Sequence, residues 1–127
     1  MIKNPTCCLS SDSAQHVARL MREHDVTSLP VISDLQSRHL EGMITERELC
    51  WGIIAEGKDP KTTAIADYLN HNPVTCKAED ELDHCEKTMQ QHQMRSITVV
   101  DDEGSCVGSV SQGDLAVFNQ FLSRRRA

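Results

Sequence analysis

Aromatic residues are scarce in this sequence of 127 residues and make up only 3% of it. They are Trp51, Tyr68, Phe118 and Phe121. So few rings cannot build the stacking platform with which proteins bind single-stranded RNA or DNA. Positive charge is not in excess either, because 13 Lys and Arg stand against 19 Asp and Glu and the formal net charge is −6. Broad electrostatic attraction to nucleic acid or to an anionic membrane is therefore not expected.

Long apolar runs are also absent, since no stretch approaches the roughly 20 residues of a membrane span. The N-terminal segment MIKNPTCCLSSD has no apolar signal-peptide core. Hydrophobic residues nevertheless make up 39% of the chain, enough for the core of one domain or of two half-size units. We therefore expect a soluble, globular protein of the cytoplasm that is too short to be a multidomain enzyme.

The sequence repeats itself once, at an offset of 68 residues that matches Asn4-Pro5 with Asn72-Pro73. Further identical pairs in this register are Cys8 with Cys76, Asp12 with Asp80, His16 with His84, Met21 with Met89, His24 with His92, Ser28 with Ser96, Val31 with Val99 and Asp34 with Asp102. A two-residue deletion in the second copy then brings Gly42 onto Gly108 and Leu49 onto Leu115. Two copies are too few for a solenoid, so we expect a pseudo-twofold pair of units that close against each other.

Hydrophobic spacing and turn residues predict the order β-α-β-β-α in each copy. In the first copy we expect a strand at 5–9, a helix capped by Ser11 or Asp12 that runs to about His24, strands at 28–33 and 40–45, and a helix at 46–56. In the second copy we expect a strand at 74–77, a helix at 80–92, strands at 96–101 and 106–111, and a helix at 112–122. A polar turn at 56–63 and a helical turn at 64–69 join the copies. The predicted fold class is α/β, with one unit at 1–63 and the other at 64–127.

Three segments carry a family resemblance: LMREHDVTSLPVISD, LEGMITERELC and TMQQHQMRSITVVDDEGSCVGSVSQGDL. A helix ending in Met-x-x-His, an LPV-type strand, a Gly-containing strand and a helix start of the (Ser/Thr)-x-x-Asp type occur twice, with Glu in place of Asp in the first copy. Over nearly its whole length the chain resembles a tandem pair of CBS domains. The link AEGKDPKTTAIADYL is similar to that of stand-alone bacterial pairs of the hypoxic response protein type. The resemblance implies two β-α-β-β-α units packed with pseudo-twofold symmetry, two clefts between them, and a regulatory role without catalysis.

In this family a cleft binds the adenosine part of AMP, ADP, ATP or S-adenosylmethionine, and the Asp of the motif accepts hydrogen bonds from ribose hydroxyls. Such chemistry suits a carboxylate at a helix start, where N–H groups also face the phosphate. The resemblance implies Thr6 beside the base, Val26 and Thr27 near the base edge, Ser109, Ser111 and Asp114 around the ribose, and Arg95 with Ser96 toward the phosphates. A helix N-cap with a first-turn acid is the alternative reading of Ser111 and Asp114.

The other cleft departs from the family pattern. Its motif is TERE, Thr45 to Glu48, and the extra methylene of Glu pushes the carboxylate into the space that a ribose would fill. Its other wall would consist of Val74, Thr75 and Met94. A solvated acid at a helix start is the alternative interpretation of Glu48.

Six cysteines without a Cys-x-x-Cys pair or a secretion signal are expected to be reduced, and most of them to be small buried hydrophobes. A metal- or redox-responsive module stays open as an alternative function. Cys7, Cys8 and Cys76 lie on the predicted first strands, and a histidine could complete a tetrahedral set of the ligand types that suit Zn²⁺.

The remaining expectations concern partners and catalysis. His24 and His92 end the predicted first helices, where the helix dipole favours them, so we expect no enzyme activity. The predicted helices 46–56 and 112–122 carry more apolar residues, including Trp51 and Phe121, than one inward face needs. We therefore expect a homodimer that signals to an effector protein whose identity the sequence does not reveal.

Overall fold

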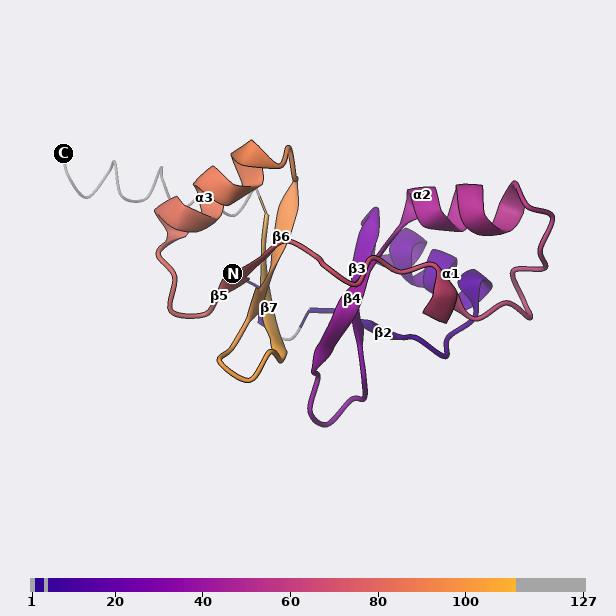
Figure 1. Ribbon diagram of the computed structural model, residues 1–127, viewed down its shortest axis with the longest axis horizontal. Coiled ribbons are helices and arrows are strands. Elements are labelled where there is room, and N and C mark those ends of the chain that lie inside the picture. The colour runs from indigo at the N-terminus through magenta and orange to yellow at the C-terminus, as the bar shows by residue number, and fades with distance from the viewer. Residues whose placement is uncertain (1, 4, 112–127) are drawn as a thin grey trace. The chain divides into compact units, whose positions relative to one another are not determined.

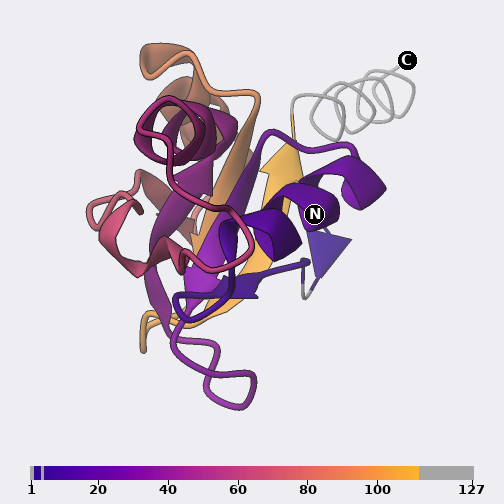
Figure 2. The same ribbon diagram turned by 90° about the vertical axis from the view of Figure 1, so that its right-hand side faces the viewer.

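The computed structural model describes residues 2, 3 and 5–111, and two views show its ribbon (Figures 1 and 2). Contacts within the chain separate two compact units. The first unit is Thr6–Pro73, and the second contains the described residues of Met1–Pro5 and Val74–Ala127. These units do not coincide with the predicted repeats, because the segment that follows residue 63 packs on the first repeat. Ile65 is buried in the core of the first unit, and Asn70 exchanges two backbone hydrogen bonds with Met43.

The first unit is a small sheet covered by helices. Its elements are β2 (Cys8–Leu9), α1 (Ala14–His24), β3 (Ser28–Ile32), β4 (Leu40–Thr45), α2 (Glu46–Glu48), the π-helix η1 (Leu49–Ile54) and the 3-10 helix η2 (Ile65–Asp67). The strand order is β2-β3-β4, with β2 parallel to β3 and β3 antiparallel to β4. Both α1 and the segment from α2 through η1 lie on one side of this sheet (Figure 1).

Helix α1 follows directly from its sequence. Ser13 begins it, because the Ser13 hydroxyl accepts a hydrogen bond from the His16 N–H at 3.1 Å, and not Ser11 or Asp12 as predicted. Ala14, Val17 and Met21 recur at helical spacing and are buried in the core of the first unit. The helix ends where Asp25 takes a left-handed conformation with φ 52°.

The second unit has the same construction with one strand more. Its elements are β1 (Ile2–Lys3), β5 (Thr75–Lys77), α3 (Leu82–Gln91), β6 (Ser96–Val100) and β7 (Cys106–Ser111). The order is β1-β7-β6-β5; β5 is parallel to β6, and the other pairs are antiparallel. Helix α3 covers one face of this sheet (Figure 1). The helix predicted at 112–122 lies outside the described residues.

Backbone details confirm the internal repeat. Asp12 Oδ2 accepts the Leu9 N–H at 2.9 Å, and Asp80 Oδ2 accepts the Lys77 N–H at the same distance, 68 residues further on. The left-handed residue after α1, Asp25, likewise has its counterpart after α3 in Gln93, with φ 54°. The two units therefore share the same local structure at equivalent positions.

Two elements differ from the prediction. The short strand β1 pairs with β7 and was not expected, because two residues show no periodicity. The helix expected at 46–56 begins at Glu46 as predicted, but from Leu49 to Ile54 it is a π-helix. Gly52 in this segment lies against the Tyr68 ring, so that a Cβ at this position would lie 2.8 Å from Tyr68 Cδ1. No helix in the described part of the chain is long and apolar enough to cross a membrane.

Candidate functional site

The Thr45 to Glu48 motif lies where β4 passes into α2. Thr45 is opposite Ser28 in the β3–β4 ladder, so the two hydroxyl residues share one face of the sheet. The Glu46 N–H donates to the Thr27 carbonyl oxygen at 2.9 Å and fixes the helix start against the beginning of β3. Thr45 is extended, with φ −115° and ψ 165°, and its side chain makes no capping hydrogen bond.

Glu48 carries the most informative atom of this motif. Its Oε2 has no exposed surface and no hydrogen-bond partner, and it is the one buried side-chain nitrogen or oxygen in residues 5–111 with that property. Nearly all buried polar atoms in proteins have a partner, and an exception calls for an explanation. A carboxylate oxygen can only accept, so a hydroxyl or N–H donor would satisfy it. A solvated acid, the sequence-based alternative, would expose both oxygens to water.

Two residues predicted for the adenosine base, Val26 and Thr27, line a groove within the first unit. This groove, of about 570 Å³, runs between α1 and the α2–η1 segment. Its apolar lining includes Ala18, Met21 and Leu49. Neither Thr45 nor Glu48 contributes to it. We call it the helix groove; the sequence predicted apolar helix faces but could not show that they form a concave surface.

In the second unit, the ladder places three of the predicted ribose and phosphate residues, Ser96, Ser109 and Ser111, on one face. Ser96 pairs with Ser111, and Thr98 pairs with both Ser109 and Thr75. Directly paired residues point to the same side of a sheet, and Ile97, Val99 and Val110 turn to the core on the opposite side. We call this set the hydroxyl face: Thr75, Ser96, Thr98, Ser109 and Ser111. Asp114, the residue predicted to hold the ribose, lies outside the described residues.

The other predicted site residues are distributed as follows. Thr6 Oγ1 contacts the His24 ring, 3.3 Å from Nε2, and Arg95 is exposed. Val74 and Met94 pack against the core of the second unit. The prediction that each cleft takes its walls from both repeats stays a prediction.

The cysteines are mostly buried, as predicted: Cys8, Cys76, Cys85 and Cys106 are buried, Cys7 is half-buried and Cys50 is exposed. Burial, with a smaller effect of Asp12, raises the pKa of Cys8 to about 12, so this thiol stays protonated. The Arg38 guanidinium donates to Cys7 Sγ at 3.2 Å, a contact that the sequence did not suggest. No group of three or more His, Cys, Asp or Glu in the described residues could hold a metal ion. The zinc set suggested around Cys7, Cys8 and Cys76 would draw ligands from both units and stays a prediction.

The sequence pattern of the CBS domain matches residues 1–54 and again 65–118. The chain belongs to the CBS domain family. It is 32% identical over 107 residues to the CBS domain-containing protein YhcV of Bacillus subtilis, covering 84% of this chain and 73% of that protein. It is 30% identical over 111 residues to hypoxic response protein 1 of Mycobacterium tuberculosis, covering 87% of this chain and 76% of that protein. It spans only 56% of a third relative, protein MK0525 of Methanopyrus kandleri, at 27% identity over 88% of this chain.

Solved CBS structures share the fold. Hypoxic Response Protein I, solved with two coordinated zinc ions, superposes with a TM-score of 0.79 at 29% identity, covering 92% of each chain. CBSX2, solved in complex with AMP, superposes with a TM-score of 0.78 at 21% identity, covering 97% of this chain and 94% of that one. The CBS domain pair of MJ0100, solved with 5′-methylthioadenosine and S-adenosyl-L-methionine, superposes with a TM-score of 0.72 at 22% identity, covering 94% of this chain and 92% of that one. The predicted fold and family are confirmed.

Proposed function

We propose that this protein is a regulatory module that binds an adenosyl ligand, an adenine nucleotide or S-adenosylmethionine, and passes its occupancy to an effector protein. CBS pairs of the same fold have been solved with AMP and with S-adenosyl-L-methionine, which supports this ligand class. CBS domains regulate and do not catalyse, so we propose no enzyme activity. The cytoplasmic location stays a prediction.

The partnerless Oε2 of Glu48 is the observation that carries the proposal. The vicinal hydroxyls of a ribose are two adjacent donors, and a carboxylate at a strand end can accept from them. Thr45, three residues before Glu48, adds a side chain whose hydroxyl caps nothing. The longer reach of Glu relative to Asp, which the sequence suggested as an obstacle, would then be the means by which the carboxylate meets the ligand.

The hydroxyl face supports a second site of the same kind. Ser96, Ser109 and Ser111 supply donors and acceptors on one side of the β6–β7 ladder. Asp114 follows Ser111 at the spacing that separates Glu48 from Thr45. We propose Asp114 as the ribose acceptor of this site, with Arg95 toward the phosphates.

Calorimetry and thermal shift with AMP, ADP, ATP, NADH and S-adenosylmethionine test the proposal. A ligand at 100 times its Kd stabilises the protein by about 2.7 kcal/mol, which a melting experiment detects. Glu48→Gln keeps the shape of the side chain and removes its charge; we expect it to weaken binding at that site about tenfold or more. Glu46→Gln, an exposed acid in the same turn, is the matched control. Asp114→Ala tests the other site in the same way. No binding of any of these ligands to the wild-type protein would refute the proposal.

A homodimer is the second part of the proposed function. Beside the helix groove, Trp51 is 64% exposed, Ile54 59% and Val26 39%, and the Arg47 guanidinium lies 4.9 Å from the centre of the Trp51 ring. Large exposed apolar side chains around a concave apolar surface are typical of an interface. A second copy of the chain brings the same apolar side chains to this surface, and symmetric pairs are the commonest assembly of soluble proteins.

Light scattering at micromolar concentration should therefore give twice the mass of the chain. Trp51→Glu should give a folded monomer, because the indole is exposed within the chain and a charge there opposes only assembly. Leu35→Glu, at a β3–β4 loop residue that is 73% exposed, is the matched control and should remain dimeric. A monomeric wild-type protein would refute the assembly.

A further inference from the structure

Two thiols of the second unit lie together in its core. Cys76 on β5 is 1% exposed, and Cys85 on α3 is 3% exposed. They belong to one cluster of buried side chains. Burial, followed by the interaction with Cys85, raises the pKa of Cys76 to about 12. The Cys76 thiol is therefore protonated while it stays buried.

The first unit provides the comparison. Its counterpart of Cys76 is Cys8, also buried, but the counterpart of Cys85 is Val17. Both positions pack a strand against a helix in the core of their own unit. A sulfur at the helix position is therefore not needed for packing, because valine fills the same place in the other copy.

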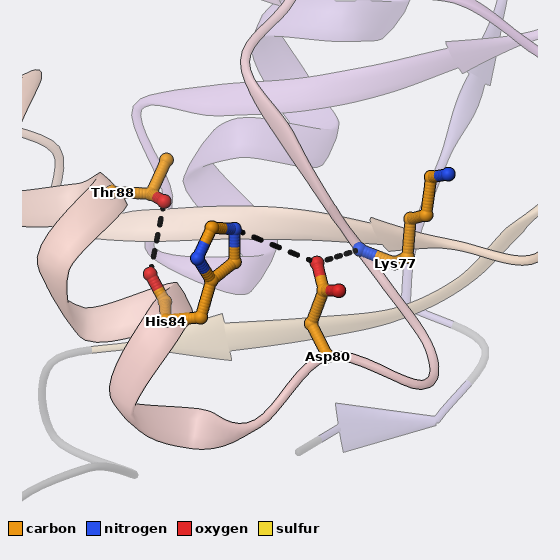
Figure 3. A network of polar contacts seen from close by, with 4 residues as sticks. All are labelled: Lys77, Asp80, His84 and Thr88. Carbon is orange, nitrogen blue, oxygen red and sulfur yellow. Dashed lines mark hydrogen bonds and ion pairs between the residues drawn. The ribbon is translucent and has the colours of Figure 1, made fainter.

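Hydrogen bonds order the short segment between the two thiols, but the start of α3 lacks a side-chain cap. Asp80 Oδ2 accepts the Lys77 N–H at 2.9 Å and lies 3.8 Å from His84 Nε2, and the Thr88 hydroxyl donates to the His84 carbonyl at 2.9 Å (Figure 3). However, Glu81 at the N-cap of α3 makes no side-chain capping hydrogen bond, whereas its counterpart Ser13 caps α1. Cys85 is in the first turn of α3, and an uncapped first turn opens more readily than the rest of a helix.

We propose that Cys76 and Cys85 are a redox-active pair that forms a disulfide within the second unit when the protein meets a low-molecular-weight disulfide such as oxidised glutathione. Opening of the first turn of α3 exposes Cys85, whose thiolate attacks one sulfur of the oxidant and releases one molecule of thiol. The Cys76 thiolate then attacks Cys85 in this mixed disulfide and releases the second thiol. Two protein thiols are oxidised and one small disulfide is reduced to two thiols, so the reaction balances without a cofactor. This inference does not depend on adenosyl binding.

The full chain, reduced and then equilibrated with oxidised glutathione, tests the proposal by peptide mapping. Trypsin cuts after Lys61, Lys77 and Lys87 and so places Cys76 in peptide 62–77 and Cys85 in peptide 78–87. We expect these two peptides to be linked by a disulfide and to separate again with reduced glutathione. The exposed thiol of Cys50, in peptide 48–58, should carry glutathione and reports that the oxidant was active.

Two variants taken from the first unit sharpen the test. Cys85→Val installs the residue of the other copy and should abolish the linked peptides; Cys85→Ala serves if valine does not fold. Glu81→Ser should cap α3 and slow disulfide formation about fivefold, the factor expected of an average N-cap. Modification of Cys50 without any link between peptides 62–77 and 78–87 would overturn the proposal. An unchanged rate in Glu81→Ser would overturn the opening of α3 as the route.

Discussion

Replacing Glu48 with methionine should make the unliganded protein more stable, which few substitutions of a charged residue do. Methionine has nearly the length of glutamate and brings no acceptor into the space that Oε2 occupies without a partner. A buried acceptor left unsatisfied costs about 1–3 kcal/mol. Because Glu48 as a whole is only partly buried, we expect Glu48→Met to raise the free energy of unfolding by about 1–2 kcal/mol. For a chain of this size the melting temperature should rise by roughly 3–8 °C.

The assay is urea unfolding followed by circular dichroism, with and without the adenosyl ligand that binds the wild-type protein. Glu48→Gln should stay near the wild-type stability, because its amide leaves a polar atom in the same place. Glu46→Met, in the same turn but exposed, should change the stability by no more than about 0.5 kcal/mol. If the gain in stability and the loss of ligand binding in Glu48→Met both come from removing Oε2, the ligand should stabilise the wild-type protein more than it stabilises the variant. A Glu48→Met protein no more stable than the wild type would show that Oε2 has a partner in solution, and the reasoning would fail.

Further predictions follow from other sites. Gly42→Ala should destabilise the protein by about 2–3 kcal/mol in urea unfolding, because a Cβ would overlap with the Asn70 carbonyl oxygen and force the backbone apart; an unchanged midpoint would contradict this close approach. Ser13→Ala should cost about 1 kcal/mol by loss of the bond from the His16 N–H, and its unfolding midpoint measures this cap. Hydrogen bonds from Ser37 lower the pKa of Asp34, so its stabilising effect is present above the ordinary carboxyl pKa and is lost as the pH falls through the lowered value. Melting curves between pH 2 and 7 should therefore be less acid-sensitive for Asp34→Asn, and identical profiles would count against this effect.

The element order and the repeat were predictable because both come from local pattern. Apolar spacing in α1 and alternation in β4 and β7 each occupy enough residues to give a periodic signal. The strand β1 could not be found in this way, because its pairing with β7 joins residues more than 100 positions apart. The π-helix η1 was also missed. Gly52 within it lies close to the Tyr68 ring, and no local pattern encodes a contact between residues 16 positions apart.

The site was predictable only to the level of residue types. Alternation along β7 implies that Ser109 and Ser111 share a face, and the ladder adds Ser96 and Thr98 to it. From the sequence, the extra methylene of Glu48 was interpreted as an obstacle to a ribose. The burial of a single carboxylate oxygen is a property of the packed structure, and no sequence pattern shows it. The thiol pair was missed because nine positions separate Cys76 from Cys85, a spacing that matches no motif. Only the packing of β5 against α3 brings the two together.

Comparing equivalent positions of the two copies separates residues that the fold requires from residues that differ between the two units. A residue that both copies share, such as the Asp12 and Asp80 that make the same turn, is accounted for by local structure. Positions where the copies differ are free of that constraint: Ser13 against Glu81, Val17 against Cys85, and Glu48 against Asp114. At the first pair, only Ser13 caps its helix with a side-chain hydrogen bond. At the second pair, both side chains are buried and only the second copy has a thiol. At the third, both copies keep an acid but at different reach, which we expect of two sites that bind related ligands with different affinities. Exchanging residues between the copies therefore separates what the fold requires from what each site has acquired.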